Sequence, residues 1–117
     1  MYKVALVIYS KLEGAGSSAI YRAMMFAQEL KQAGDDVCII FDGAGSTAAA
    51  EMSNPAHDLH GLYMSIRPLI RGVCDFCAKY YKVIDLVEGD GLPLLVDDRG
   101  HASLRALLVE GRQIITY

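Results

Sequence analysis

The feature that most constrains the fold is a repeated pairing of a short apolar run with a helical segment. Lys3 to Tyr9 and Val37 to Phe41 are apolar runs without the strict alternation of a half-exposed strand. Such runs are typical of strands that are covered on both faces. Between them, apolar residues at helical spacing predict a long helix, with Ser17 or Ser18 as its N-cap and Gly34 at its end.

The same pairing continues to the last residue. After the turn at 42–45, Ser46 or Thr47 is expected to cap a short helix that runs through Met52. Further along, Pro68 is expected to stop a helical pattern. The remaining predicted elements are a helix over 57–67, a strand over 69–74, a short helix over 76–81, a short strand over 94–96, a helix over 101–110 and a strand over 112–117.

Strands that alternate with helices through short turns predict an α/β domain with a mostly parallel sheet of about five strands. The 117 residues fit one such domain, 1–117. Binding sites in open parallel sheets lie beyond the carboxyl ends of the strands. We therefore expect three segments to meet at one edge, namely Ser10–Ser18, Asp42–Thr47 and the helix start at Cys74.

Composition narrows the classes of function and partner. Hydrophobic residues make up 53% of the chain and the formal net charge is −3, which argues against nucleic acid or an anionic membrane as the main partner. No apolar stretch is long enough to span a bilayer, and the apolar start is expected to be a strand rather than a signal peptide. The odd number of cysteines, 3, favours a reducing cytoplasm. So much apolar surface on a small domain also predicts a homo-oligomer.

The motif with the most chemistry is the pair Cys74 and Cys77, which stands between a predicted strand and a predicted helix. Unpaired N–H groups at a helix start favour a thiolate, the nucleophilic form of cysteine. Lys79, one turn further on, is expected to help stabilise that thiolate, whereas Asp75 opposes it. The alternative is that both cysteines are ordinary buried residues, because cysteine often fills a core. Cys38 lies within a strand pattern and is expected to be such a core residue.

Four features in this order resemble the DsrE/DsrF-like family, whose fold occurs in sulfur-relay proteins of tRNA thiolation and of bacterial sulfur oxidation. They are the first strand with its loop and long helix, the second strand that ends in Asp42-Gly43, the cysteine motif, and the final helix before the strand 112–117. The resemblance implies a three-layer α/β/α sandwich and assembly into trimers or hexamers. In the sulfur-relay members, the cysteine that matches Cys74 accepts a persulfide sulfur and passes it on, while Cys77 matches a second cysteine found in some branches. Tyr81-Lys82 stand where the family usually has an arginine-glycine pair.

Persulfide transfer through Cys74, with Cys77 able to resolve the persulfide as a disulfide, is accordingly the predicted function, with partner proteins as sulfur donor and acceptor. An oligomeric assembly or binding module with structural cysteines is the alternative. A thioredoxin-like oxidoreductase is a third candidate, but the motif does not follow the first strand. A zinc site would need His57 and His60 to complete the ligand set, so we expect no metal and no cofactor.

The other candidate site residues border the predicted sheet edge. Gly16, Ser17 and Ser18 are candidates for anion binding at a helix start, although a tight turn into a capped helix is the favoured explanation. Asp42 and Gly43 end the second strand, where Asp42 is expected to orient a loop by side-chain hydrogen bonding. We assign no chemistry to His101, and we expect Asp97 and Asp98 to form a solvated turn.

Overall fold

The computed structural model describes all 117 residues as an α/β domain built on a five-stranded, all-parallel sheet. The strands are β1 (Lys3–Ile8), β2 (Asp36–Phe41), β3 (Ile70–Cys74), β4 (Leu94–Leu95) and β5 (Gln113–Thr116). Their order across the sheet is β4-β3-β2-β1-β5. The strand pattern predicted from the apolar runs is confirmed. None of the helices combines the length and the apolar character that a membrane-spanning segment needs.

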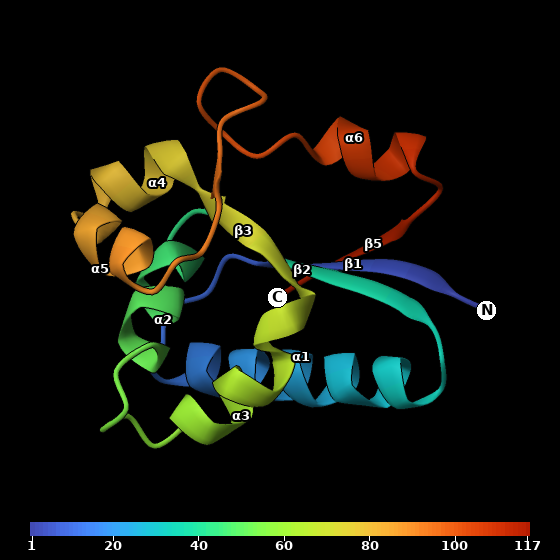
Figure 1. Ribbon diagram of the computed structural model, residues 1–117, viewed down its shortest axis with the longest axis horizontal. Helices are drawn as coiled ribbons and strands as arrows, with labels where there is room; N and C mark the ends of the chain where they lie inside the picture. The colour runs from blue at the N-terminus through green and yellow to red at the C-terminus, as the bar shows by residue number, and fades with distance from the viewer.

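The helices form layers on both faces of this sheet, as Figure 1 shows. The elements are α1 (Ala15–Gln32), α2 (Gly45–Met52), α3 (His60–Ile66), the 3₁₀ turn η1 (Arg67–Leu69), α4 (Asp75–Tyr80), α5 (Ile84–Gly89) and α6 (Leu104–Val109). In Figure 1, α1 and α3 lie below the sheet and α6 lies above it. The predicted sandwich of helices around a parallel sheet is therefore present.

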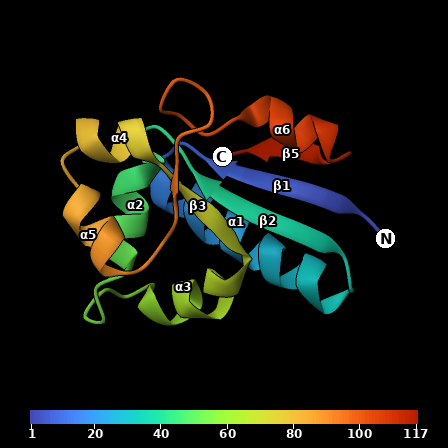
Figure 2. The same ribbon diagram turned by 45° about the horizontal axis from the view of Figure 1, so that its top comes forward.

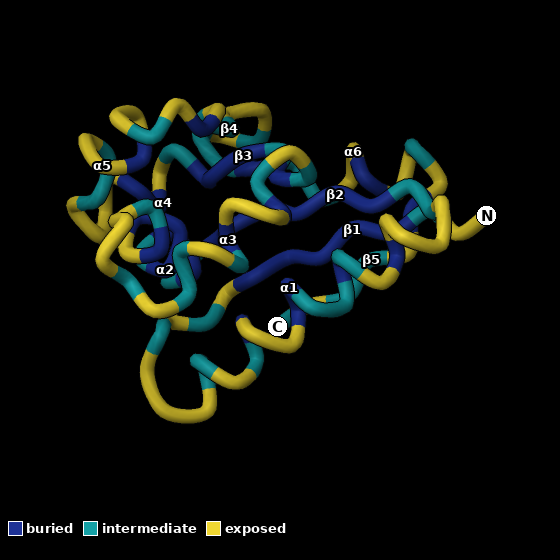
Figure 3. The backbone as a smooth tube through the Cα atoms, turned by 60° about the horizontal axis from the view of Figure 1, so that its bottom comes forward, coloured by how far each residue is buried: buried dark blue, intermediate teal, exposed yellow.

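The two faces of the sheet bury cores of very different size. Alternate side chains of β1 and β2 point to opposite faces. Leu6, Ile39 and Phe41 join a core of 22 buried residues with the helices α1 to α5, and Tyr63 is its largest fully buried side chain. On the other face, only 6 buried residues pack together, and Leu107 of α6 is among them. Figure 3 shows most of β1, β2 and β3 in dark blue in the middle of the molecule.

Several helix boundaries differ from the predicted ones. The long helix begins at Ala15 with Gly14 as its N-cap, so the expectation that Ser17 or Ser18 would cap it is wrong. Likewise, α2 begins at Gly45 rather than after a cap at Ser46 or Thr47. In both cases the helix begins before the serine or threonine that was expected to cap it. A glycine in the first turn lets the preceding loop or strand backbone approach the helix closely. A Cβ on Gly16 would lie 2.2 Å from the carbonyl oxygen of Lys11.

The second half of the chain holds the larger departures. The predicted helix over 57–67 is shorter, since the chain forms turns until His60, and Pro68 lies in η1 rather than in an abrupt break. Helix α5 was not predicted at all, because it has only six residues and one buried side chain, Val87. The last helix begins at Leu104 with Ser103 as its N-cap, whose side chain accepts a hydrogen bond from the N–H of Ala106. His101 is therefore in a loop and not in the helix.

Candidate functional site

The candidate site lies at the carboxyl ends of β2 and β3. Phe41 pairs with Val73 in the parallel register, so the residues that follow them, Asp42 and Cys74, emerge side by side. Cys77 lies on the first turn of α4, directly after β3. The segment after β4 brings His101 to the same place, and Figure 2 shows this segment in orange as it passes the end of α4 on the way to α6.

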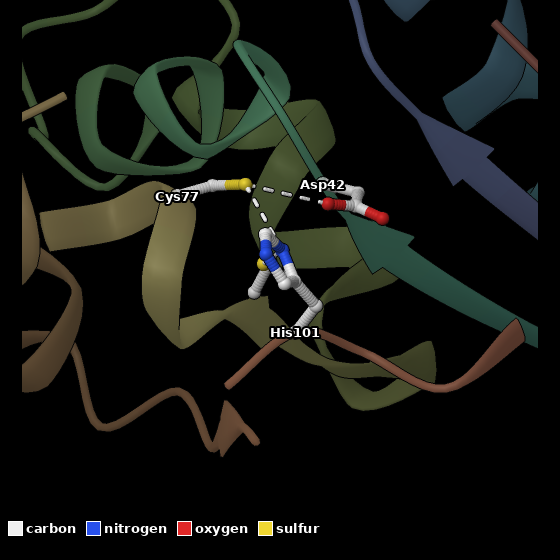
Figure 4. Close-up of side chains that lie close together, drawn as sticks. Asp42, Cys77 and His101 are labelled. Atoms are coloured by element: carbon white, nitrogen blue, oxygen red, sulfur yellow. Dashed lines mark hydrogen bonds between the residues drawn. The ribbon is translucent and has the colours of Figure 1, made fainter. Parts of the chain in front are cut away.

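Four side chains from these segments form one compact cluster. The sulfur of Cys74 lies 3.3 Å from Nδ1 of His101. The sulfur of Cys77 lies 3.9 Å from the same nitrogen and 3.5 Å from Oδ1 of Asp42. All four ligand-type atoms lie within 4.8 Å of one another. We call Asp42, Cys74, Cys77 and His101 the thiol cluster, and Figure 4 shows Cys77 pointing at both Asp42 and His101.

Backbone and ring contacts fix the imidazole of His101. Its N–H and C=O form a pair of hydrogen bonds with Asp98, at 2.8 and 2.9 Å, which closes a tight turn. The ring lies 4.5 Å from the ring of Phe76, which itself follows Cys74 by two residues. The N–H of Phe76 donates to the carbonyl of Gly100, so the loop and α4 are joined directly. The cluster therefore depends on a contact between segments that are distant in sequence.

The thiol cluster is largely removed from water. Cys74 is fully buried, and Cys77 and Asp42 are each 8% exposed. Burial raises the pKa of the Cys77 thiol, and the hydrogen bond with Cys74 raises it further. Cys77 is therefore a thiol at neutral pH and donates its hydrogen bond to Asp42. Partial burial and then the Asp42 carboxylate raise the pKa of Tyr9, which borders the cluster at the end of β1.

Asp42 is held by its own loop. The N–H of Gly43 donates to Oδ1 of Asp42 at 2.7 Å. Gly43 has a φ of 53°, a left-handed conformation that glycine adopts without strain. The expectation that Asp42 orients the loop by side-chain hydrogen bonding is thus confirmed, but the same carboxylate also faces the thiols.

The structure distributes the predicted site residues over three places. Asp42, Cys74 and Cys77 come together, with Gly43 adjacent. Gly16, Ser17 and Ser18 lie in the first turn of α1, outside the thiol cluster. The ammonium group of Lys79 lies 2.9 Å from the carboxylate of Asp75, on the exposed side of α4. Lys79 is thus engaged by Asp75, and the basic side chain in contact with Cys74 is His101, whose Nδ1 lies 3.3 Å from the sulfur.

Sequence reasoning missed His101 and instead considered His57 and His60. Nδ1 of His57 accepts from the N–H of Leu59, and Nδ1 of His60 bonds to the carbonyl of Met52, so neither belongs to the thiol cluster. The signal for His101 was present but weak. His101 is the one histidine that comes after a predicted short strand, β4, which pairs with β3. Segments that follow parallel strands begin at the carboxyl edge of the sheet, where the cysteines lie.

An open cleft of about 520 Å³ adjoins the thiol cluster and gives it a route to solvent. Asp42 and His101 line it, together with Asp97, Asp98 and Arg105. A larger cleft of about 800 Å³ lies elsewhere, between α2 and α5. The smaller cleft is the relevant one, because it alone reaches residues of the cluster.

A parallel α/β sandwich with an Asp-Cys-Cys-His cluster at the carboxyl edge of its sheet is the class of protein that this fold and site define. No family model matches the chain. Over 115 residues the chain is 31% identical to the uncharacterised protein MJ0733 of Methanocaldococcus jannaschii. The alignment covers 97% of this chain and 93% of that protein. The chain belongs to the family of this archaeal protein.

A solved structure shares the fold at lower sequence similarity. It is that of BT1422 from Bacteroides thetaiotaomicron, a conserved protein of unknown function. The TM-score is 0.68 with 17% identity, over 97% of this chain and 94% of that chain. This likeness establishes the architecture and leaves the chemistry to be argued from the thiol cluster itself.

Proposed function

We propose that the protein accepts and passes on persulfide sulfur through Cys74, as sulfur-relay members of the DsrE/DsrF-like family do. The observation that carries the proposal is the 3.3 Å contact between the sulfur of Cys74 and Nδ1 of His101. A cysteine beside an imidazole is the usual arrangement for an activated thiol nucleophile. Cys77, held as a thiol by burial and by Asp42, leaves Cys74 as the group that attacks.

One departure from the family pattern lies at a backbone position with an unusual conformation. Lys82 stands where the family usually has glycine, and its φ is 60°. Residues other than glycine rarely adopt this left-handed region. At this position the chain therefore departs from the family pattern, with a lysine in a backbone conformation that favours glycine.

The proposed transfer is a thiol–disulfide-type exchange that needs no added oxidant or reductant. His101 removes the proton of Cys74, and the thiolate attacks the outer sulfur of a donor persulfide. The sulfur–sulfur bond of the donor breaks, a new one forms on Cys74, and the donor thiolate leaves with the proton from His101. An acceptor thiolate then takes the outer sulfur by the same exchange. Cys74 is fully buried, and the cleft lined by Asp42 and His101 is the route by which a donor approaches the thiol cluster.

The test is the mass of the Cys74 peptide after treatment of metal-free protein with a small persulfide donor. We expect a gain of one sulfur atom on Cys74, which is lost in Cys74→Ser and strongly slowed in His101→Ala. Cys38→Ala is the matched control, because Cys38 is also buried but lies within a strand and outside the thiol cluster. An unmodified Cys74, beside a control protein that takes up sulfur from the same donor, contradicts the proposal.

A second candidate is an oligomeric assembly or binding module with structural cysteines. Two observations favour it. Both thiols are buried, and α6 leaves Leu108 and Val109 62% and 69% exposed on the thinly covered face of the sheet. Under this alternative, Cys74 and Cys77 resist a thiol reagent in the native protein and react only after unfolding, while light scattering shows a stable oligomer.

A further inference from the structure

The thiol cluster holds four side chains whose donor atoms suit a metal ion. We propose that Asp42, Cys74, Cys77 and His101 bind one zinc ion per chain. This inference does not depend on sulfur transfer, and it departs from the expectation of no metal, which rested on His57 and His60 as the remaining ligands. The sequence supplied two ligands, and the fold supplies the other two from the end of β2 and from the segment between β4 and α6.

The donor set selects the class of metal. Two thiolates and an imidazole favour zinc over calcium or magnesium, which prefer oxygen ligands alone. A carboxylate completes the four ligands of a closed tetrahedral zinc site. The site is also mostly dry, since three of its four members are buried and His101 is half-buried.

The distances are close to those of a tetrahedron that contains zinc. Bonds of about 2.3 Å to sulfur and about 2.0–2.2 Å to nitrogen and oxygen imply ligand–ligand edges of roughly 3.3–3.8 Å. The observed edges include 3.3 Å from Cys74 to His101 and 3.5 Å from Cys77 to Asp42. No pair of donor atoms is more than 4.8 Å apart. Closure around the ion therefore needs a movement of about 1.5 Å at most along the longest edge, within what side-chain rotation supplies.

Binding exchanges two protons for one divalent ion. The thiols of Cys74 and Cys77 lose their protons to solvent, and the two sulfur–zinc bonds replace the hydrogen bonds to His101 and Asp42. The cluster then carries two thiolates and one carboxylate against the charge of the ion. Nothing in the cluster is oxidised or reduced.

The surroundings include the supporting contacts that metal sites require. The N–H of Gly43 donates to Oδ1 of Asp42, and the ring of Phe76 packs against His101, so both outer ligands are already oriented. The adjoining cleft gives an entry path, and three carboxylates line it against one guanidinium, that of Arg105. This excess of negative charge attracts a cation.

The experiment uses the whole protein, stripped with a chelator under reducing conditions and titrated with zinc or cobalt in the absence of any sulfur donor. We expect one ion per chain, and with cobalt the intense charge-transfer absorption of thiolate ligands together with the visible bands of tetrahedral geometry. Bound zinc should also slow alkylation of Cys74 and Cys77. The extent of Cys38 alkylation should be the same with and without zinc.

Variants decide whether the ion sits in the thiol cluster. His101→Ala and Asp42→Asn should each weaken zinc binding by at least ~10-fold, the lower end of what loss of an outer contact alone costs. His57→Ala is the control, since His57 lies outside the cluster and binding should not change. Circular dichroism checks that each variant is folded. The proposal is overturned if folded protein fails to bind zinc or cobalt, or if binding is equal in all three variants. Sulfur uptake by metal-free protein would stand in either case, so the two proposals fail separately.

Discussion

Two polar clusters lie at opposite ends of the same sheet, and they differ in how fully their groups are paired. At the amino ends of the strands, Arg112 is buried and donates to the carbonyls of Val4 and Asp36 and to the carboxylates of Asp36 and Glu110, at 2.8–3.2 Å. At the carboxyl ends, the thiol cluster has only sulfur contacts of 3.3–3.9 Å and one short bond from Gly43.

This difference indicates that the groups around Arg112 stabilise the fold, whereas the thiol cluster is available for chemistry. Burial would lower the pKa of Arg112, but its hydrogen bonds to Glu110 and Asp36 raise it above the ordinary value. Arg71 adds a two-pronged pair with Glu110, at 2.7 and 2.8 Å. Charge-assisted bonds of this kind are about twice as strong as neutral ones, whereas thiol contacts are weak. We call Asp36, Arg71, Glu110 and Arg112 the arginine cluster.

The largest expected effect is on stability when the arginine cluster is broken. Arg112→Ala should lower the free energy of unfolding by about 2–3 kcal/mol, because two strand carbonyls and two carboxylates lose their donor. The figure is below that for a fully buried pair, since Asp36 and Glu110 stay partly exposed. Urea unfolding measures it. Arg99→Ala, which removes an exposed pair with Asp98, should leave the urea unfolding curve unchanged.

Acid should weaken the arginine cluster through Glu110. Hydrogen bonds from Arg71 and then Arg112 lower the pKa of Glu110 to about 2, against about 4.3 for an unfolded chain. The stabilising effect is therefore complete above about pH 4.3 and is lost as the pH falls toward 2. Melting temperatures between pH 6 and pH 2 should fall less steeply for Glu110→Gln than for wild type. Parallel curves for the two proteins would show that another carboxyl controls the acid limb.

The smallest expected effect is on stability when the thiol cluster is altered. His101→Ala in metal-free protein should lower the free energy of unfolding by less than ~1 kcal/mol, since it removes two weak sulfur contacts and one ring contact with Phe76. The same urea measurement applies. A loss as large as that of Arg112→Ala would mean that the thiol cluster is a structural element, and would favour the alternative of buried, inert cysteines.

The sequence predicted the strands and the long helix well, because burial leaves a local signature there. Apolar runs mark β1 and β2, and the stripe of α1 is buried as the spacing predicts. Boundaries were less predictable, because both Gly14 and Ala44 precede their helices without any side-chain cap. The six-residue α5 has too few buried positions to show a period.

The sequence by itself determined the class of fold and the chemical character of the site: a parallel sheet with helices on both faces, and two cysteines at a strand end. Only the tertiary structure decided what surrounds those cysteines. His101 is 27 residues from Cys74, and Asp42 is 35 residues from Cys77. Neither separation leaves a local pattern, because these contacts arise from the parallel register of β2 and β3 and from a loop that packs against α4.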